Sequence, residues 1–166
     1  LFDSFGSSEA VGMGGSISRA GEAATRTATF ALGPTCAVFT EDGRRVTPGS
    51  GERGLVAVGG FIPLGYFRDE AKTAQTFRIF EGQRWSVPGD WAEIAADGSL
   101  ILLGRGSVCI NTGGEKVFPE EVEEALKKHA SVRDAVAVGI PDDRFGETIC
   151  AVVEAEPGHT PDLATL

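Results

Sequence analysis

The sequence predicts an α+β fold in two parts, and three observations lead to this prediction. Glycine is abundant, at 23 of 166 residues, so tight turns should divide the chain into short strands and loops. Hydrophobic residues make up 42% of the sequence, which is enough to build a core. The segment Gly104-Arg105-Gly106-Ser107 is typical of a flexible joint. We therefore place a domain boundary there, with one part over residues 1–104 and the other over 105–166.

The first part is expected to consist mainly of strands and loops. Residues 1–35 are rich in Gly and Ser at their start and polar afterwards, which predicts a loop followed by coil. A short helix is expected over 69–77, because Asp69 can cap its first turn. Apolar runs bounded by turn residues predict two strands and a hairpin that turns at Asp97-Gly98. These elements lie at 36–40, 54–60 and 91–103.

The second part contains the clearest helix, over 119–129. Pro119 suits the first helical position, where no N–H group is needed. Glu123–Lys127 and Glu124–Lys128 have the spacing of stabilising ion pairs on one helix face. The flanking apolar runs predict three strands, at 108–111, 132–140 and 148–155. The second part is thus expected to be a small α+β unit.

Charge and cysteine content narrow the range of functions. The formal net charge is -9, so a general nucleic-acid-binding surface is not expected. No apolar run approaches the ~20 residues needed to span a bilayer. The cysteines have no metal-ligand spacing, and we expect them to be small buried residues of a reducing cytoplasm. They are Cys36, Cys109 and Cys150.

Residues with ligand-binding chemistry cluster near the start of the chain, in Asp3-Ser4-Phe5-Gly6-Ser7-Ser8-Glu9. A purine can stack on the ring of Phe5. Ser8 can donate a hydrogen bond to a phosphate, and Glu9 supplies the hard oxygen ligand that suits Mg²⁺. The alternative is an ordinary loop, because short Ser- and Gly-rich runs are common in loops.

This segment resembles the aromatic-Gly-x-Ser/Thr-Glu motif of the adenylate-forming superfamily, which includes acyl-CoA synthetases, luciferases and peptide-synthetase adenylation domains. Four later stretches also resemble segments of that family. The resemblance implies the β-rich end of the large N-terminal domain, followed by part of the small mobile C-terminal domain. The four stretches begin at Gly65-Tyr66, Trp85-Ser86, Gly104-Arg105 and His129-Ala130.

The resemblance assigns nucleotide-binding roles to residues of the first part. The ring of Phe5 would pack on adenine, and Asp3-Ser4 would meet the amino edge of the base. Ser8 would contact the α-phosphate, and Glu9 would help to hold Mg²⁺.

Three further assignments concern Asp90, Gly6 and the Gly65-Tyr66 stretch. Asp90 would accept hydrogen bonds from both ribose hydroxyls, as a carboxylate can, with a plain turn aspartate as the alternative. Gly6, also assigned to the nucleotide site, and residues 11–14 are candidates for acyl-chain contact. The Gly65-Tyr66 stretch is interpreted as packing only.

The resemblance assigns other roles to the second part. Arg105 would contact the nucleotide, and Ser107 would be the hinge about which the small domain rotates between two half-reactions. The family often has Asp or Lys at this hinge, and Ser107 departs from that pattern. The loop Gly113-Gly114, together with Lys116, would line the channel for the CoA arm.

The function implied is that of an AMP-forming acyl-CoA synthetase. It would convert a fatty acid or related small-molecule carboxylic acid, ATP and coenzyme A, with Mg²⁺, into an acyl-CoA through an acyl-adenylate. It would act in the cytoplasm without a nucleic-acid partner, and a homodimer is a candidate assembly. Two alternatives stay open: an adenylating enzyme with a carrier-protein thiol as acceptor, and a non-catalytic nucleotide-binding remnant.

The family's phosphate-gripping loop and its late catalytic lysine find no counterpart in this sequence. No lysine follows Lys128, so we expect the loop upstream of residue 1 and the lysine downstream of residue 166. A cation at a transferring phosphoryl group commonly stabilises the transition state strongly. We therefore assign no catalytic residue within residues 1–166 and expect the chain alone to be inactive.

Overall fold

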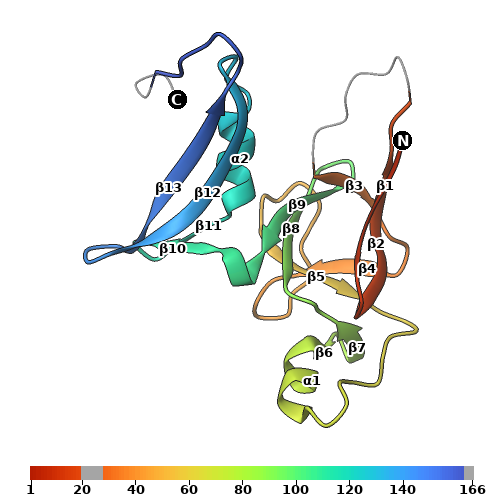
Figure 1. The fold of residues 1–166 in the computed structure, drawn as a ribbon. Helices are drawn as coiled ribbons and strands as arrows, with labels where there is room; N and C mark the ends of the chain where they lie inside the picture. The colour runs from red at the N-terminus through yellow and green to blue at the C-terminus, as the bar shows by residue number, and fades with distance from the viewer. Residues whose placement is uncertain (20–27, 163–166) are drawn as a thin grey trace. The chain divides into compact units, whose positions relative to one another are not determined.

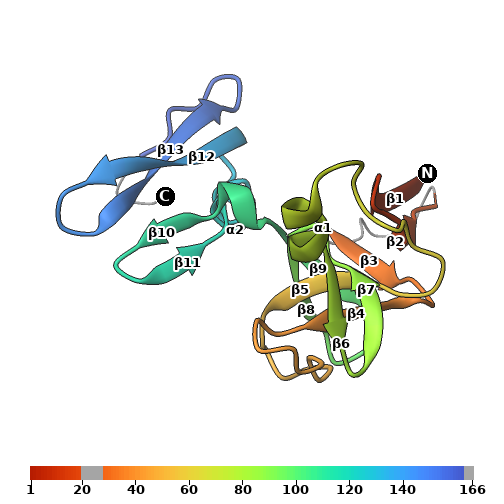
Figure 2. The same cartoon turned by 90° about the horizontal axis from the view of Figure 1, so that it is seen from below.

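The computed structural model describes residues 1–19 and 28–162, apart from the side chain of Ser107. By its internal contacts the chain divides into two compact units, Leu1–Leu103 and Gly104–Leu166. Figures 1 and 2 show the elements of each unit. The described residues form sheets with two α-helices, in agreement with the predicted α+β class.

The first unit is a strand-rich unit with one short helix. In chain order its elements are β1 (Phe2–Ser7), β2 (Ala10–Ile17), β3 (Thr29–Leu32), β4 (Cys36–Phe39), β5 (Gly54–Val58), α1 (Glu70–Thr76), β6 (Phe77–Phe80), β7 (Gln83–Ser86), β8 (Asp90–Ile94) and β9 (Leu100–Arg105). Within the described residues these strands form one sheet in the order β1-β2-β3-β9-β8-β5-β7-β6, and β4 pairs with β5. All of the pairings with a defined register are antiparallel.

Two apolar clusters stabilise this unit. One includes Met13 of β2, Val56 of β5 and Leu100 of β9, none of which is exposed. The other is aromatic: the ring of Phe39 lies 4.7 Å from that of Phe80 and 5.1 Å from that of Trp85. Because Phe39 and Val38 are successive residues of β4 and belong to different clusters, this strand packs on both of its faces.

The prediction of loop and coil over 1–35 is wrong for most of the described residues, because β1, β2 and β3 lie there. Glycine here permits close packing and does not prevent pairing. In the β1–β2 hairpin Phe5 is paired with Gly14. A Cβ at Gly14 would lie 2.8 Å from the Cβ of Phe30, so this strand position requires the missing side chain. Residues 20–27 of the predicted coil lie outside the described residues.

The other expected elements of the first unit are confirmed with shifted ends. β4 and β5 correspond to the two predicted strands, and β8 and β9 to the predicted hairpin. Helix α1 begins after Asp69, whose side chain accepts a hydrogen bond from the N–H of Lys72 at 2.9 Å.

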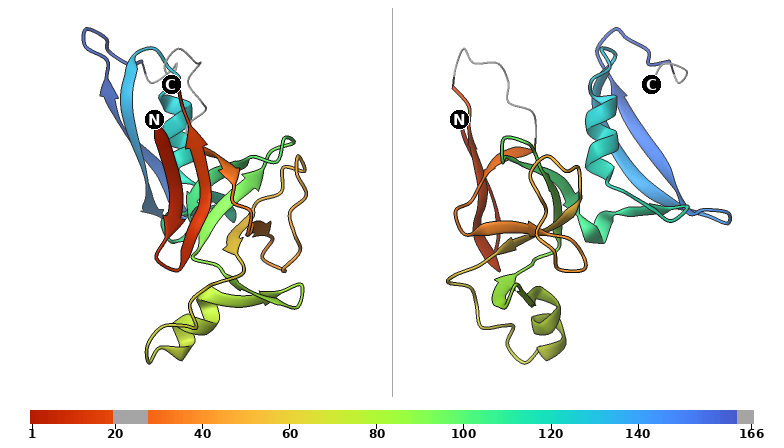
Figure 3. Two further views of the ribbon diagram at one scale, coloured as in Figure 1. Left: turned by 90° about the vertical axis from the view of Figure 1, so that its right-hand side faces the viewer. Right: turned by 180° about the vertical axis from the view of Figure 1, so that it is seen from behind.

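The second unit is a small sheet covered by one helix. Its elements are the 3₁₀ turn η1 (Gly106–Val108), β10 (Ile110–Thr112), β11 (Glu115–Val117), α2 (Pro119–Leu126), β12 (Val132–Asp142) and β13 (Gly146–Ala155). The strand order is β11-β10-β13-β12. Helix α2 lies along β12, as Figure 3 shows. Phe118, which precedes the helix, is buried.

Two details of the second unit correct the sequence-based expectations. Helix α2 ends at Leu126, before the predicted end at His129. Lys127 forms its ion pair with Glu124 at 2.9 Å. The carboxylate of Glu123 instead accepts the N–H of Ala137 on β12 at 2.9 Å, so it joins helix to strand.

The cysteines differ in burial. Cys36 is buried as expected, whereas Cys109 and Cys150 are only half-buried. Neither α1 nor α2 of the described residues has the length and apolar character that a membrane crossing requires.

Candidate functional site

The first cluster of predicted site residues lies on the β1–β2 hairpin. Asp3, Ser4, Phe5 and Gly6 belong to β1, and Ser8 and Glu9 form the turn that leads into β2. Antiparallel pairing fixes the register from Phe2 to Ser7, with an irregularity between Phe5 and Ser7. The bulge changes the direction of the strand immediately before Ser8 and Glu9.

Phe5 packs against another aromatic residue. Its ring is stacked on that of Phe30, with centroids 5.6 Å apart and an angle of 26° between the planes. The side chain is half-buried at the edge of the apolar cluster that contains Met13. Phe5 therefore contributes to the core, and adenine packing would have to use the part of the ring that Phe30 does not cover.

Glu9 is held at both its side chain and its backbone. Its Oε1 accepts a hydrogen bond from the Tyr66 hydroxyl at 2.6 Å. Its carbonyl oxygen accepts a hydrogen bond from Ser86 Oγ at 2.7 Å, and Ser86 is completely buried. The bond from Tyr66 lowers the pKa of Glu9, and the nearby charge of Lys72 acts in the same direction. The carboxylate is thus kept in its charged form, which a cation requires.

Asp90 is connected to this cluster through the chain. It is the first residue of β8 and half-buried, and only residues 87–89 separate it from Ser86, the last residue of β7. Gly89 has a φ of +105°, a conformation that glycine adopts readily. The hydrogen bond from Ser86 to Glu9 therefore joins the segment that carries Asp90 to the β1–β2 turn.

The charge and geometry of Glu9 fit a magnesium ion that arrives with a nucleotide. Among the described residues no group of three His, Cys, Asp or Glu side chains could hold a metal ion. Mg²⁺ commonly binds through one or two carboxylates together with substrate phosphates, and so it does not need a cage made only of protein ligands. One fixed, charged carboxylate satisfies this requirement.

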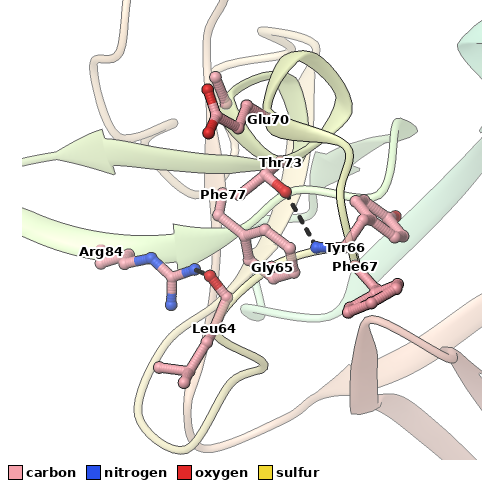
Figure 4. A pocket seen from close by; sticks show the side chains of 9 residues that line it. Leu64, Gly65, Tyr66, Phe67, Glu70, Thr73, Phe77 and Arg84 are labelled. Atoms are coloured by element: carbon pink, nitrogen blue, oxygen red, sulfur yellow. Dashed lines mark hydrogen bonds between the residues drawn. The ribbon is translucent and has the colours of Figure 1, made fainter.

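Two hollows lie beside the residues that hold Glu9. One is an open cleft lined by Ser8 and Glu9 and also by Val58, Phe61 and Ile62. The other lies beside Tyr66 and is bordered by Phe77 and Arg84 (Figure 4). Arg84 donates hydrogen bonds to the carbonyl oxygens of Pro63 and Leu64, at 2.9 Å and 2.7 Å. This guanidinium therefore shapes the loop before α1.

The remaining predicted residues belong to the second unit. Arg105 is exposed at the end of β9, and Ser107 lies in η1. Gly113 and Gly114 form the β10–β11 turn with φ angles of +58° and +89°, and Lys116 is exposed on β11. The N–H of Gly113 donates to the carbonyl oxygen of Phe145 at 2.9 Å, which connects this glycine turn to the β12–β13 turn.

Sequence reasoning missed the roles of Tyr66 and Ser86 in this cluster. Both lie in stretches that were singled out, but Tyr66 was interpreted as packing and Ser86 received no role. Tyr66 lies 57 residues from Glu9 in sequence. Its hydroxyl was a signal that a partner is needed, because buried or half-buried tyrosine hydroxyls usually find one.

Comparison with known families gives one match within the second part of the chain. Residues 121–166 match the family described as AMP-binding enzyme C-terminal domain.

Curated relatives match over the whole chain. A medium/long-chain-fatty-acid–CoA/3-oxocholest-4-en-26-oate–CoA ligase from Mycolicibacterium smegmatis is 52% identical over 100% of this chain. A 3-oxocholest-4-en-26-oate–CoA ligase from Rhodococcus rhodochrous is also 52% identical over 100% of the chain. In both cases the chain spans 30% of the relative's length.

Solved structures share the fold. The amide bond synthetase McbA from Marinactinospora thermotolerans matches with a TM-score of 0.77 and 28% identity, over 98% of this chain and 32% of that protein. Apo MatB from Rhodopseudomonas palustris matches with a TM-score of 0.72 and 28% identity, over 98% and 32% respectively.

Proposed function

We propose that this chain forms part of an AMP-forming carboxylic acid:CoA ligase, because it is similar over its whole length to curated CoA ligases and residues 121–166 match an AMP-binding enzyme C-terminal domain. The observation that carries this proposal is the 52% identity to such ligases along the entire chain. The substrate class we propose is a fatty acid or a steroid-derived acid, since the names of these relatives specify such acids. The chain represents 30% of their length, so the activity proposed is that of a longer protein.

We propose that the two contact units correspond to two domains of that protein. Residues 1–104 would be the C-terminal part of the large AMP-binding domain, and residues 105–166 the start of the small mobile domain. The division of the chain after Leu103 supports this boundary. The match of residues 121–166 to an AMP-binding enzyme C-terminal domain supports the identity of the second part.

The reaction would proceed in two steps. The substrate carboxylate attacks the α-phosphorus of ATP, which forms acyl-AMP and releases pyrophosphate. The thiolate of CoA then attacks the acyl carbon and displaces AMP. Mg²⁺ would neutralise phosphate charge when bound. The chain's own residues bind and orient the reactants.

Each assigned residue has one role in this proposal. Glu9 presents a charged oxygen to the nucleotide-bound cation, supported by its lowered pKa and its fixed position. Ser8 contacts the α-phosphate, and Arg105 contacts the nucleotide. Asp90 accepts hydrogen bonds from the ribose hydroxyls. Asp3, Ser4, Phe5 and Gly6 meet the base. Ser107 serves as the hinge, and Gly113, Gly114 and Lys116 contact the CoA arm.

We place this reaction in the cytoplasm. No disulfide joins Cys36, Cys109 and Cys150 in the described part of the chain, in keeping with a reducing compartment.

The test is AMP release by the complete protein encoded by the gene, with residues 1–166 alone beside it. The assay contains ATP, Mg²⁺, CoA and a panel of fatty and ring-bearing acids. We expect CoA-dependent AMP release by the complete protein only. Acid-dependent pyrophosphate release without a CoA requirement would favour another acceptor, such as a carrier-protein thiol. Nucleotide binding without turnover on any acid would favour a non-catalytic nucleotide-binding protein.

A variant pair tests the site within the same assay. Asp90→Asn should lower kcat/KM for ATP about tenfold, because hydrogen bonds to a charged group contribute about 1.5–3 kcal/mol. Asp134→Asn is the matched control, since Asp134 is an exposed residue of β12 to which the proposal gives no role. Equal kcat/KM values for the two variants would contradict the ribose assignment.

A further inference from the structure

The hydrogen bond between Tyr66 and Glu9 has the properties of a strong interaction. Its length is 2.6 Å, within the range of hydroxyl–carboxylate bonds in which the acceptor is ionised. The bond connects the β1–β2 turn to the segment just before α1. It engages one carboxylate oxygen of Glu9, Oε1, and so restricts the rotation of the carboxylate group.

Tyr66 is itself fixed by the helix that follows it. Its N–H donates to Thr73 Oγ1 at 2.9 Å, as Figure 4 shows, and Thr73 Oγ1 donates to the carbonyl oxygen of Asp69 at 2.6 Å. The ring of Tyr66 lies 5.9 Å from that of Phe77, and the Lys72 ammonium lies 4.2 Å from its centroid. Packing and a cation–π contact therefore hold the phenol ring in place.

The backbone of Glu9 has a separate support. Ser86 Oγ donates to the Glu9 carbonyl oxygen at 2.7 Å, so the turn does not depend on Tyr66 for its position. The side chain beyond Cα has several rotatable bonds, and the 2.6 Å bond from the Tyr66 hydroxyl restrains its far end at Oε1. Removal of the Tyr66 hydroxyl should therefore release the carboxylate without displacing the turn.

We propose that Tyr66 is a positioning residue that directs the Glu9 carboxylate toward a nucleotide-bound divalent cation. This inference rests on the proposed function, in which Glu9 meets that cation. Partners of this kind commonly change metal affinity or activity by about 10–100-fold when they are removed. Because Ser86 still holds the backbone of Glu9 when the Tyr66 hydroxyl is absent, we expect a loss near the lower end of that range.

The experiment measures Mn²⁺ binding to the complete protein in the presence of a non-hydrolysable ATP analogue, by electron paramagnetic resonance. The variants are Tyr66→Phe, Glu9→Gln and the double variant. We expect Tyr66→Phe to weaken Mn²⁺ binding about tenfold, and the double variant to bind no more weakly than Glu9→Gln. Phe67→Leu, at the exposed aromatic residue that follows Tyr66, is the control and should bind Mn²⁺ normally.

A kinetic readout separates positioning from a general structural role. In acid-dependent pyrophosphate exchange, Tyr66→Phe should raise the half-saturating Mg²⁺ concentration and leave the KM for the carboxylic acid unchanged. Glu9→Asp is a second variant that keeps the charge but is one methylene shorter than Glu9. It should weaken Mn²⁺ binding as Tyr66→Phe does, and adding Tyr66→Phe to it should cause little further loss.

The outcomes distinguish this inference from the proposed function. If Glu9→Gln weakens Mn²⁺ binding and Tyr66→Phe does not, Tyr66 is not a positioning residue and the proposed function stands. Equal and independent losses in the double variant would show that Tyr66 acts without Glu9, which also overturns the inference. If Glu9→Gln has no effect, the role proposed for Glu9 fails, and the inference fails with it.

Discussion

Glu9 of the first unit and Glu120 of the second are the same chemical group, and their surroundings shift the pKa in opposite directions. Glu9 accepts a hydrogen bond from the Tyr66 hydroxyl, and this bond lowers its pKa. Burial raises the pKa of Glu120, and the charges of Glu123 and Glu121 raise it further. Glu120 Oε2 is buried and accepts no hydrogen bond from the described residues.

This difference shows which carboxylate suits a cation and which one weakens the fold. A carboxylate with a donor keeps its charge at little cost and is ready for a ligand. A carboxylate oxygen that is buried without a donor loses its hydration, and this loss disfavours the charged form. Glu120 lies in the first turn of α2, where its own backbone N–H and the helix dipole offset part of this cost. The predictions below test this contrast.

The largest loss of stability is expected at Gly104, where an added side chain would meet the carboxylate of Glu120. Gly104 has a φ of +132°, and a Cβ there would lie 2.3 Å from Glu120 Oε2. Gly104→Ala should destabilise the protein by about 3 kcal/mol, because a side chain is strained at this φ and the carboxylate must move as well. Urea unfolding followed by circular dichroism measures the loss.

Gly114→Ala is the matched control for this prediction. Gly114 also has a positive φ, of +89°, but no atom would lie within 4 Å of the added Cβ. It should therefore show backbone strain alone, about 1 kcal/mol. Equal losses for the two variants would mean that the position of Glu120 is not constrained by Gly104.

A smaller effect, with a defined pH dependence, is expected for Glu120→Gln. The pKa of Glu120 in the folded protein lies above its ordinary value of 4.5. Its contribution to stability is therefore fully present below about pH 4.5 and is lost as the pH rises through the raised pKa. Glutamine carries no charge, so this variant should be more stable than the wild type near pH 7, and the advantage should disappear toward pH 4.

Urea unfolding from pH 4 to 7.5 measures this difference in the free energy of unfolding. Glu115→Gln, at an exposed residue of β11, is the control and should differ little from the wild type near neutral pH. A Glu120→Gln variant that is less stable than the wild type at pH 7 would contradict the contrast, because it would mean that the charged carboxylate stabilises the fold.

Local signals in the sequence were sufficient for several elements. Asp69 caps α1 as expected, since a capping side chain acts within one helical turn. The β8–β9 hairpin turns at Asp97-Gly98, where Gly98 has a φ of +83°. These features depend on neighbouring residues, so the sequence contains the information directly.

Other features depend on contacts that are distant in sequence. The strands β1 and β2 were missed because their glycines resemble loop residues, and only the approach of Phe30 to Gly14 shows why they are needed. The support of Glu9 by Tyr66 and Ser86 spans 57 and 77 residues. No local pattern encodes that pairing, although each residue lies in a stretch that the sequence had singled out.

Glu154 provides a third case, a carboxylate that has an ion-pair partner but is also exposed to solvent. The smallest change in stability is expected there. Arg133 Nη1 lies 3.0 Å from Glu154 Oε1 across β12 and β13, and the two side chains are 60% and 58% exposed. Arg133→Gln should lower the free energy of unfolding by about 0.5 kcal/mol, because water competes for both charges. The difference should vanish in about 1 M salt, where the screening length falls to about 3 Å. Lys128→Gln, an equal change in charge at an exposed residue, controls for the net charge of the protein. A loss well above 1 kcal/mol that persists in salt would mean that an exposed pair stabilises this fold as a buried one does, and burial would then not account for the contrast between Glu9 and Glu120.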